Sequence, residues 1–234
     1  MASWDAKELR EAVLKLYDGE ARNIASEAAG SLSDRLWFVE FHYFECKDLL
    51  ERQLPQVSSE EEVFCRLFNV HDEHGEEFEI IRRQSQAHLY ACIQSLHCVA
   101  DTLGSLLNAT LSLGLKGAFY SHNVLEKLVA EGMVQIYQPF SALIHHPDFV
   151  YLNALVNRSK HTSVVAIPYA VDYVADGRHG MQFSAFRQKG TPHDKRWALE
   201  FVASETDRQS RLVVIIGNAL NAELKRRLKY RSIS

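Results

Sequence analysis

Apolar positions recur with helical spacing from Glu76 to Leu113, a stretch with no proline. At about 100° per residue, one face is nearly all apolar, a second carries small side chains, and a polar line lies between them. A helix with two such faces can receive neighbours on both sides, so we expect it to be the centre of a helical bundle. The apolar face comprises Phe78, Ile81, Ser85, Leu89, Cys92, Leu96, Val99, Leu103, Leu107 and Thr110, and the polar line comprises Gln86, Tyr90, His97, Asp101, Gly104 and Asn108.

Apolar stripes of the same period predict further helices on either side of this one. The first is expected to end at Gly30, and the second is so rich in aromatic residues that we expect it to be buried on more than one side. A helix of about three turns is predicted after Ser59, before the polar run HDEHG at 71–75. The other predicted helices span 4–28, 33–53, 121–131, part of 133–145, 148–160 and 206–230.

The pattern changes to alternation after the helix that ends near Lys160. Residues 163–175, 181–188 and 196–203 are rich in β-branched and aromatic side chains, with turn residues between the first two runs. They predict a small antiparallel meander of two or three strands. The expected fold is therefore mainly α: a single domain over 1–234, with five or six helices around the long one and a β-meander inserted before the last helix.

Composition restricts the class of protein. The chain has 234 residues, of which 47% are apolar and 24% charged, as in an ordinary globular domain. A formal net charge of −4 argues against a surface that binds nucleic acid throughout, although a local basic patch is compatible with it. We find no signal-peptide pattern and no apolar run long enough for a membrane span, so we expect a cytoplasmic protein that does not enter the membrane. Four cysteines without CxxC spacing are expected to be reduced.

The polar line offers the first candidate site. His97 and Asp101 are four residues apart, so their side chains can meet on one helical face. An Asp can orient a His and stabilise its charged form, which is half of a general-base arrangement. Asn108 lies two turns further and would hold a polar group of a ligand. The alternative is a solvated stripe, or one structural hydrogen bond between His97 and Asp101.

The second candidate site is the run NALVNRSKH, where the helical part ends and the β segment begins. Asn157, Arg158, Lys160 and His161 supply donors, cations and a titratable ring within two turns. Arg makes bidentate contacts with phosphate and His serves as acid or base, so the mixture suits a phosphate or an RNA backbone. The alternative is that these cations complement the helix dipole. The basic run KRRLKYR at 225–231 allows the same two interpretations.

A third hypothesis joins the two candidate sites. The helix that carries Asn157 and His161 must pack back on the bundle, and buried polar groups need partners. We therefore expect a side-chain atom of Asp101 to lie within about 6 Å of Asn157 or His161, forming one polar pocket.

A metal site is the remaining hypothesis. Inside a bundle, His42 with Glu45, His97 with Asp101, and His161 could converge on one ion. Neither Glu-x-x-His nor His-Glu-x-x-His occurs in the chain. We therefore expect no metal and no cofactor.

A long helix with a polar line, followed by a short helix that ends in an Asn/Arg/His cluster, resembles the HEPN (higher eukaryotes and prokaryotes nucleotide-binding) domains. The resemblance covers about residues 80–165. Here His161 follows Arg158 by three residues, a shorter spacing than the family's, and Asn157 precedes the Arg rather than following it. The resemblance implies an all-α bundle, often a homodimer, that binds RNA or a nucleotide. Many members are ribonucleases of toxin–antitoxin or phage-defence systems, and members without the motif are thought to bind rather than cut.

Three functions follow as hypotheses. The first is a HEPN-like protein that binds RNA or a nucleotide, with Arg158 and His161 as catalytic residues if it is a ribonuclease. In that case His97, Asp101, Asn108, Asn157 and Lys160 would contribute to binding. The second is a non-catalytic helical module that binds a protein partner. The third, more remote, is a metal-dependent enzyme built in a helical bundle.

Overall fold

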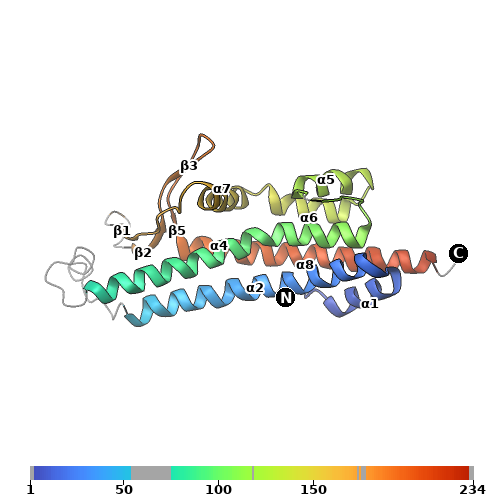
Figure 1. Ribbon diagram of the computed structural model, residues 1–234, viewed down its shortest axis with the longest axis horizontal. Helices are drawn as coiled ribbons and strands as arrows, with labels where there is room; N and C mark the ends of the chain where they lie inside the picture. The colour runs from blue at the N-terminus through green and yellow to red at the C-terminus, as the bar shows by residue number, and fades with distance from the viewer. Residues whose placement is uncertain (1–2, 54–74, 118, 173, 175–177, 232–234) are drawn as a thin grey trace. The chain divides into compact units, whose positions relative to one another are not determined.

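The computed structural model describes residues 3–53, 75–117, 119–172, 174 and 178–231. Seven helices lie in these residues, with short antiparallel strands before the last one (Figure 1). The predicted mainly α fold with a small β insertion is confirmed. The helices are α1 (Ala6–Leu16), α2 (Gly19–Gln53), α4 (Gly75–Leu111), α5 (Ser121–Ala130), α6 (Val134–Ile144), α7 (Pro147–His161) and α8 (Ala198–Arg231).

The strands form two small antiparallel sheets in place of one meander. β1 (Tyr169–Asp172), β2 (Arg178–Phe183) and β5 (Arg196–Trp197) pair in the order β1-β2-β5. β3 (Phe186–Gln188) and β4 (Thr191–His193) form a separate hairpin, with Phe186 opposite His193.

The chain divides into two compact units. Unit 1 comprises Met1–Trp37, Leu96–Val150 and Thr206–Ser234, and unit 2 comprises Phe38–Ser95 and Tyr151–Glu205. Within unit 1, α5 and α6 pack against each other (Figure 1). The strands β1 to β5 all belong to unit 2. The predicted single domain stays a prediction.

The apolar face of α4 is buried as predicted. From Ile81 to Thr110, every position assigned to that face is shielded from solvent, and only Phe78 at its start is half-buried. The face of small residues does not provide the second buried surface, because Ala87 is exposed and its other members are half-buried. The further buried positions, Ile93, Ala100, Leu106 and Leu111, lie at the two edges of the apolar face and widen it.

The break between the first two helices is earlier than predicted. α1 ends at Leu16, and the chain turns through Gly19, whose φ is +59°, whereas Gly30 lies inside α2. A residue without a Cβ adopts this left-handed conformation at little cost. Arg22 then donates to the Tyr17 carbonyl at 3.0 Å and to the Leu14 carbonyl at 3.2 Å. The N-cap of α1 is Asp5, whose Oδ1 accepts from Glu8 N at 2.9 Å.

Of the strand predicted over 196–203, only Arg196–Trp197 is present, as β5, because α8 begins at Ala198. Trp197, Leu199 and Phe201 alternate, but a helical period competes with that alternation and continues into the rest of α8. The helical period is visible in the buried positions: Ala198, Phe201, Val202, Glu205 and Gln209. Thr206 and Ser204, expected to cap the last helix, therefore lie inside it.

Among the described residues of 163–175, only Tyr169–Asp172 form a strand, β1. Pro168 lacks an N–H for a ladder, although its carbonyl still accepts from Gln182 N at 2.9 Å. Val165 and Ile167 are buried, so the alternation predicted for this run is present without a regular strand.

The aromatic part of α2 is more exposed than predicted. The exposed fractions of Trp37, Phe38, Phe41 and Phe44 are 58%, 44%, 41% and 56%. Val39 and Cys46 on the other side are buried, so the helix is buried on one face. The helix predicted after Ser59 and the HDEHG run to His74 lie outside the described residues.

Candidate functional site

Arg158, on the last turn of α7 in unit 2, donates two hydrogen bonds. Its Nη1 donates to the Arg187 carbonyl of β3 at 2.7 Å, and its Nη2 donates to Ser163 Oγ at 3.4 Å. The carbonyl of Arg158 also accepts from Thr162 N and Ser163 N. Arg158 therefore holds the β3–β4 hairpin against the end of α7.

Lys160 and His161, the other two charged or titratable residues predicted here, are exposed. Asn157 is half-buried, and its Nδ2 donates to Asn153 Oδ1 one turn earlier, at 2.8 Å. The last turn of α7 therefore presents a cation and an imidazole to solvent, with Arg158 beside them.

The hairpin packs on α7 through its aromatic face. Phe186 is 7% exposed, and its ring lies edge-on to Tyr151 of α7 with centroids 5.4 Å apart. His193 stacks on Phe186 at 4.7 Å. Burial, and then the Arg196 guanidinium, lower the pKa of His193 despite the opposing effect of Asp194. A neutral imidazole suits this stacked position.

Sequence reasoning missed the charge of the strand segment. From Arg178 to Trp197 there are five Lys or Arg residues and one carboxylate, Asp194, in a chain whose acidic residues outnumber its basic ones, 30 to 26. Arg187 and Lys189 are exposed on the hairpin that Arg158 holds. The signal that could have found them is this local charge imbalance. It is harder to recognise than the dense basic run at 225–231, because its cations are spread over 20 residues.

His97 and Asp101, both in unit 1, contact different elements: His97 contacts Phe149 of α7, and Asp101 contacts Ser121 of α5. The His97 ring is parallel to the Phe149 ring, with an interplanar angle of 3° and centroids 6.2 Å apart. Asp101 is exposed, and its Oδ1 accepts from Ser121 Oγ at 3.0 Å, at the start of α5. Asp101 also lines a small cavity of about 190 Å³ together with Gly104, Ser105, Gly117, Phe119 and Ser121.

Asn108 closes the turn that follows α4. Its Nδ2 donates to the Leu115 carbonyl at 3.0 Å, and its Oδ1 accepts from Leu115 N at 3.1 Å. Both ends of the amide are used, so Asn108 serves the backbone of the turn. One N–H and one lone pair of the amide remain for a further hydrogen bond, so the binding role predicted for Asn108 stays a prediction.

The shared pocket predicted between the two candidate sites stays a prediction. Asp101 belongs to unit 1, whereas Asn157 and His161 belong to unit 2. Within its own unit, each of Asp101 and Asn157 has a local partner, as described above.

The histidine predicted to begin a metal site has another histidine as its neighbour. In unit 2, His42 Nδ1 of α2 lies 3.0 Å from His88 Nδ1 of α4, a hydrogen-bond distance. Burial and then His88 lower the pKa of His42, and Glu45 opposes them. A lowered pKa favours the neutral form of the His42 imidazole. Burial raises the pKa values of Cys46 and Cys92, two buried cysteines among the described residues of unit 2, to about 12, so they are thiols.

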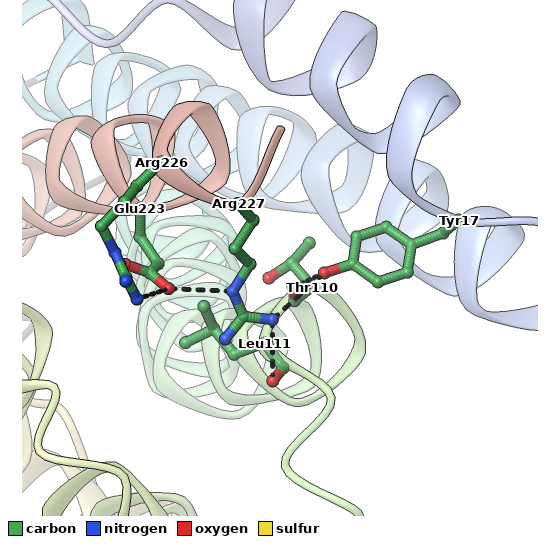
Figure 2. Close-up of polar contacts among 6 residues, drawn as sticks. All are labelled: Tyr17, Thr110, Leu111, Glu223, Arg226 and Arg227. Carbon is green, nitrogen blue, oxygen red and sulfur yellow. Dashed lines mark hydrogen bonds and ion pairs between the residues drawn. The ribbon is translucent and has the colours of Figure 1, made fainter. Parts of the chain in front are cut away.

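The basic tail of α8 has structural partners in unit 1 (Figure 2). Arg227 donates to the Leu111 carbonyl at 3.2 Å, to Tyr17 Oη at 3.4 Å and to Glu223 at 2.8 Å. The Tyr17 hydroxyl in turn donates to the Thr110 carbonyl. Arg227 and Tyr17 thus each cap one C-terminal carbonyl of α4, a kind of group that has no partner within its own helix.

A cavity of about 660 Å³ lies beside this cluster, between the α5–α6 turn and α8. The residues that line it include Glu223 and Arg226, which are bonded to each other through two contacts of 2.8 Å. Burial is the strongest influence on the Glu223 carboxyl and raises its pKa, but the hydrogen bonds from Arg226 and Arg227 outweigh it and the net pKa is lowered. The charges of this pair are therefore satisfied within the protein.

Comparisons with known proteins identify no relative. A scan against protein-family models finds no match, and searches of curated proteins and of solved structures find none either. Among the described residues, no helix has the length and apolar character that crossing a membrane requires.

Proposed function

We propose that the protein binds RNA through the end of α7, as a HEPN-like helical protein. The observation that carries the proposal is the exposure of Lys160 and His161 on the same turn as Arg158. Cations that already have internal partners cannot neutralise phosphates without losing those partners, whereas exposed ones can. At the end of α8, by contrast, Arg227 and Arg231 donate to helix carbonyls of the protein itself.

Charge supports RNA over a neutral ligand. The affinity of a protein for nucleic acid comes largely from phosphates neutralised by Lys and Arg. Unit 2 concentrates such residues at the end of α7 and on the adjoining hairpin, although the chain as a whole has a net charge of −4. A local basic surface on an acidic protein favours a defined site over coating of the nucleic acid.

The same residues suggest a route to cleavage. An imidazole at the position of His161 would take the proton of a ribose 2′-hydroxyl while that oxygen attacks phosphorus and the 5′ oxygen leaves with a proton from water. The products would be a 2′,3′-cyclic phosphate and a 5′-hydroxyl. Arg158 would direct both of its bonded nitrogens to a phosphate only if it gave up the Arg187 carbonyl, so His161 is the better candidate for a catalytic residue.

The test measures binding and cleavage separately. Binding of a fluorescent single-stranded RNA is followed by anisotropy, and cleavage by gel, for wild type and His161→Ala. We expect wild type to bind with an affinity that falls as salt rises. If it is a ribonuclease, His161→Ala should lose cleavage by at least about 100-fold, as general acid–base catalysis requires, while binding persists. Wild type that fails to bind RNA even at low salt contradicts the proposal.

The exposed aromatic residues of α2 favour a second candidate, the non-catalytic protein-interaction module. In unit 2, Phe41 and Phe44 leave 41% and 56% of their surface in solvent. Aromatic side chains dominate the energy of protein interfaces. If the partner is a second copy, sedimentation should show a dimer for wild type and a monomer for Phe44→Glu. A wild type that is monomeric throughout removes the homodimer.

A further inference from the structure

The tip of the β3–β4 hairpin holds a lysine in an unfavourable backbone conformation. The loop consists of Lys189 and Gly190, with φ of +49° and +85°. Two positive φ values are typical of a type I′ turn, in which Asn or Gly is preferred at the first position. A side chain with a Cβ is disfavoured there, because the Cβ comes too close to the following carbonyl oxygen. Lys189 therefore opposes the local preference of the turn.

The hairpin is held rigidly enough to present that lysine. Phe186 and His193 attach its inner face to Tyr151, and Arg158 binds the Arg187 carbonyl at 2.7 Å. Arg187 side-chain Nη2 donates to the Gly190 carbonyl at 3.1 Å. A guanidinium has five N–H donors, so this contact leaves donors of Arg187 for a ligand.

The outward residues of the hairpin extend the basic surface at the end of α7. Arg187 and Lys189 are exposed, as are Lys160 and His161 on the turn that carries Arg158. Because Arg158 bonds the Arg187 carbonyl directly, the hairpin that carries Arg187 and Lys189 adjoins the last turn of α7. A single phosphate needs one or two such groups, whereas a chain of phosphates needs a row of them.

We propose that the β3–β4 hairpin is a phosphate-binding arm, in which Arg187 and Lys189 hold the sugar–phosphate backbone of RNA beside Lys160 and His161. The inference rests on the proposed function and adds a second binding element to it. It also accounts for the strain at Lys189, since a cation at the turn tip favours binding at the expense of stability. Backbone strain retained at a defined position is typical of functional sites.

Substitution of Lys189 separates binding from folding. Lys189→Gly relieves the positive-φ strain, so its melting temperature should rise or stay level, while its affinity for RNA should fall. A residue with only a structural role would change both quantities in the same direction. Arg187→Gln tests the second cation without changing the residues of the turn.

The experiment measures anisotropy of a fluorescein-labelled oligouridine over a series of salt concentrations. The proteins are wild type, Lys189→Gly, Arg187→Gln and the control Lys116→Gln, which removes an exposed cation from unit 1. Each hairpin variant should bind about three- to tenfold more weakly at low salt. The slope of log K against log salt should become shallower by about 0.7 for each phosphate that the variant no longer neutralises, as expected for single strands. Lys116→Gln should match wild type.

The outcomes separate the two proposals. If wild type binds RNA and both hairpin variants bind as tightly as Lys116→Gln, the arm is refuted while the proposed function stands. If wild type does not bind RNA, or binds only an acidic peptide tested in parallel, both proposals fail. A loss of affinity in the hairpin variants, without a loss of thermal stability in Lys189→Gly, supports the arm.

Discussion

The ends of α7 and α8 have similar sequences of cations but use them differently. Near the end of α8, Arg227 donates to a carbonyl of α4, and Arg231 donates to the Lys15 and Leu16 carbonyls of α1 at 2.9 and 3.2 Å. At the end of α7, Arg158 reaches a β-strand carbonyl while Lys160 and His161 remain exposed. Whether the cations at a helix end are structural or exposed thus depends on the hydrogen-bond acceptors that the fold places beside them. Neither end is explained by compensation of its own helix dipole alone.

The largest expected effect is the loss of stability on truncating a core leucine, against which the effects of the helix-end cations can be compared. Leu103 of α4 is fully buried in unit 1. Leu103→Ala removes buried surface and leaves a cavity, so the free energy of unfolding should fall by about 2–5 kcal/mol, measured by urea denaturation. A change near zero would mean that the apolar face of α4 has been assigned incorrectly.

Arg227→Ala tests whether the α8 cations are structural. The side chain of Arg227 is 26% exposed, and its removal leaves the Leu111 carbonyl and one side of Glu223 without their charged donor. We expect a decrease of about 2 kcal/mol in unfolding free energy, within the usual range for hydrogen bonds to charged groups. Arg226→Ala is the matched control, because its described bonds go to Glu223 and not to a helix carbonyl, and it should cost far less. Equal decreases would show that the carbonyl caps add nothing.

The dependence of stability on pH also tests whether the α8 cations are structural, because Arg226 and Arg227 bond Glu223. The pKa of Glu223 is lowered from its ordinary value of 4.5 in the folded protein. Its ionised form therefore contributes stability that is complete above the unfolded-state pKa and is lost as the pH falls below it, through the folded-state pKa. The melting temperature of wild type should drop more between pH 7 and pH 3 than that of Glu223→Gln. Parallel pH curves for the two proteins would contradict this assignment.

The smallest expected effect concerns the end of α7. Lys160 is exposed, so Lys160→Gln should change the free energy of unfolding by less than about 0.5 kcal/mol. Under the proposed function it should nonetheless weaken RNA binding measurably by anisotropy. A clear loss of stability would place Lys160 in the same structural class as Arg227 and remove the contrast between the two helix ends.

The helical part of the fold follows from the periodicity of α4 and its neighbours, which is a local property of the sequence. Prediction fails where two periods compete within a few residues. At 196–203, alternation of Trp197 with Leu199 competes with a helical stripe that only becomes decisive after Phe201. At 4–30, either of two glycines could make the break, and the backbone takes its positive φ at Gly19.

The candidate site was predicted less completely, because its partners are distant in sequence. Arg158 and its acceptor Arg187 are 29 residues apart. The polar line gave no indication that the amide of Asn108 also bonds the backbone of Leu115. Conversely, the hairpin cations were visible in the sequence, but only the fold shows that they adjoin α7.

The ties between α8 and α1 affect the order in which the chain can fold during synthesis. Trp4 Nε1 donates to Asn221 Oδ1 at 3.4 Å, across 217 positions, and Lys225 forms an ion pair with Glu8. Gly217 leaves space for the Trp4 ring, because a Cβ at that position would overlap it. The ribosome releases residue 4 long before residue 217. The contacts of Trp4 and α1 with α8 can therefore form only after nearly the whole chain has been synthesised. Leu9 and Val13 of α1 are buried in the folded protein, and apolar surface of this kind makes incompletely folded chains prone to aggregation.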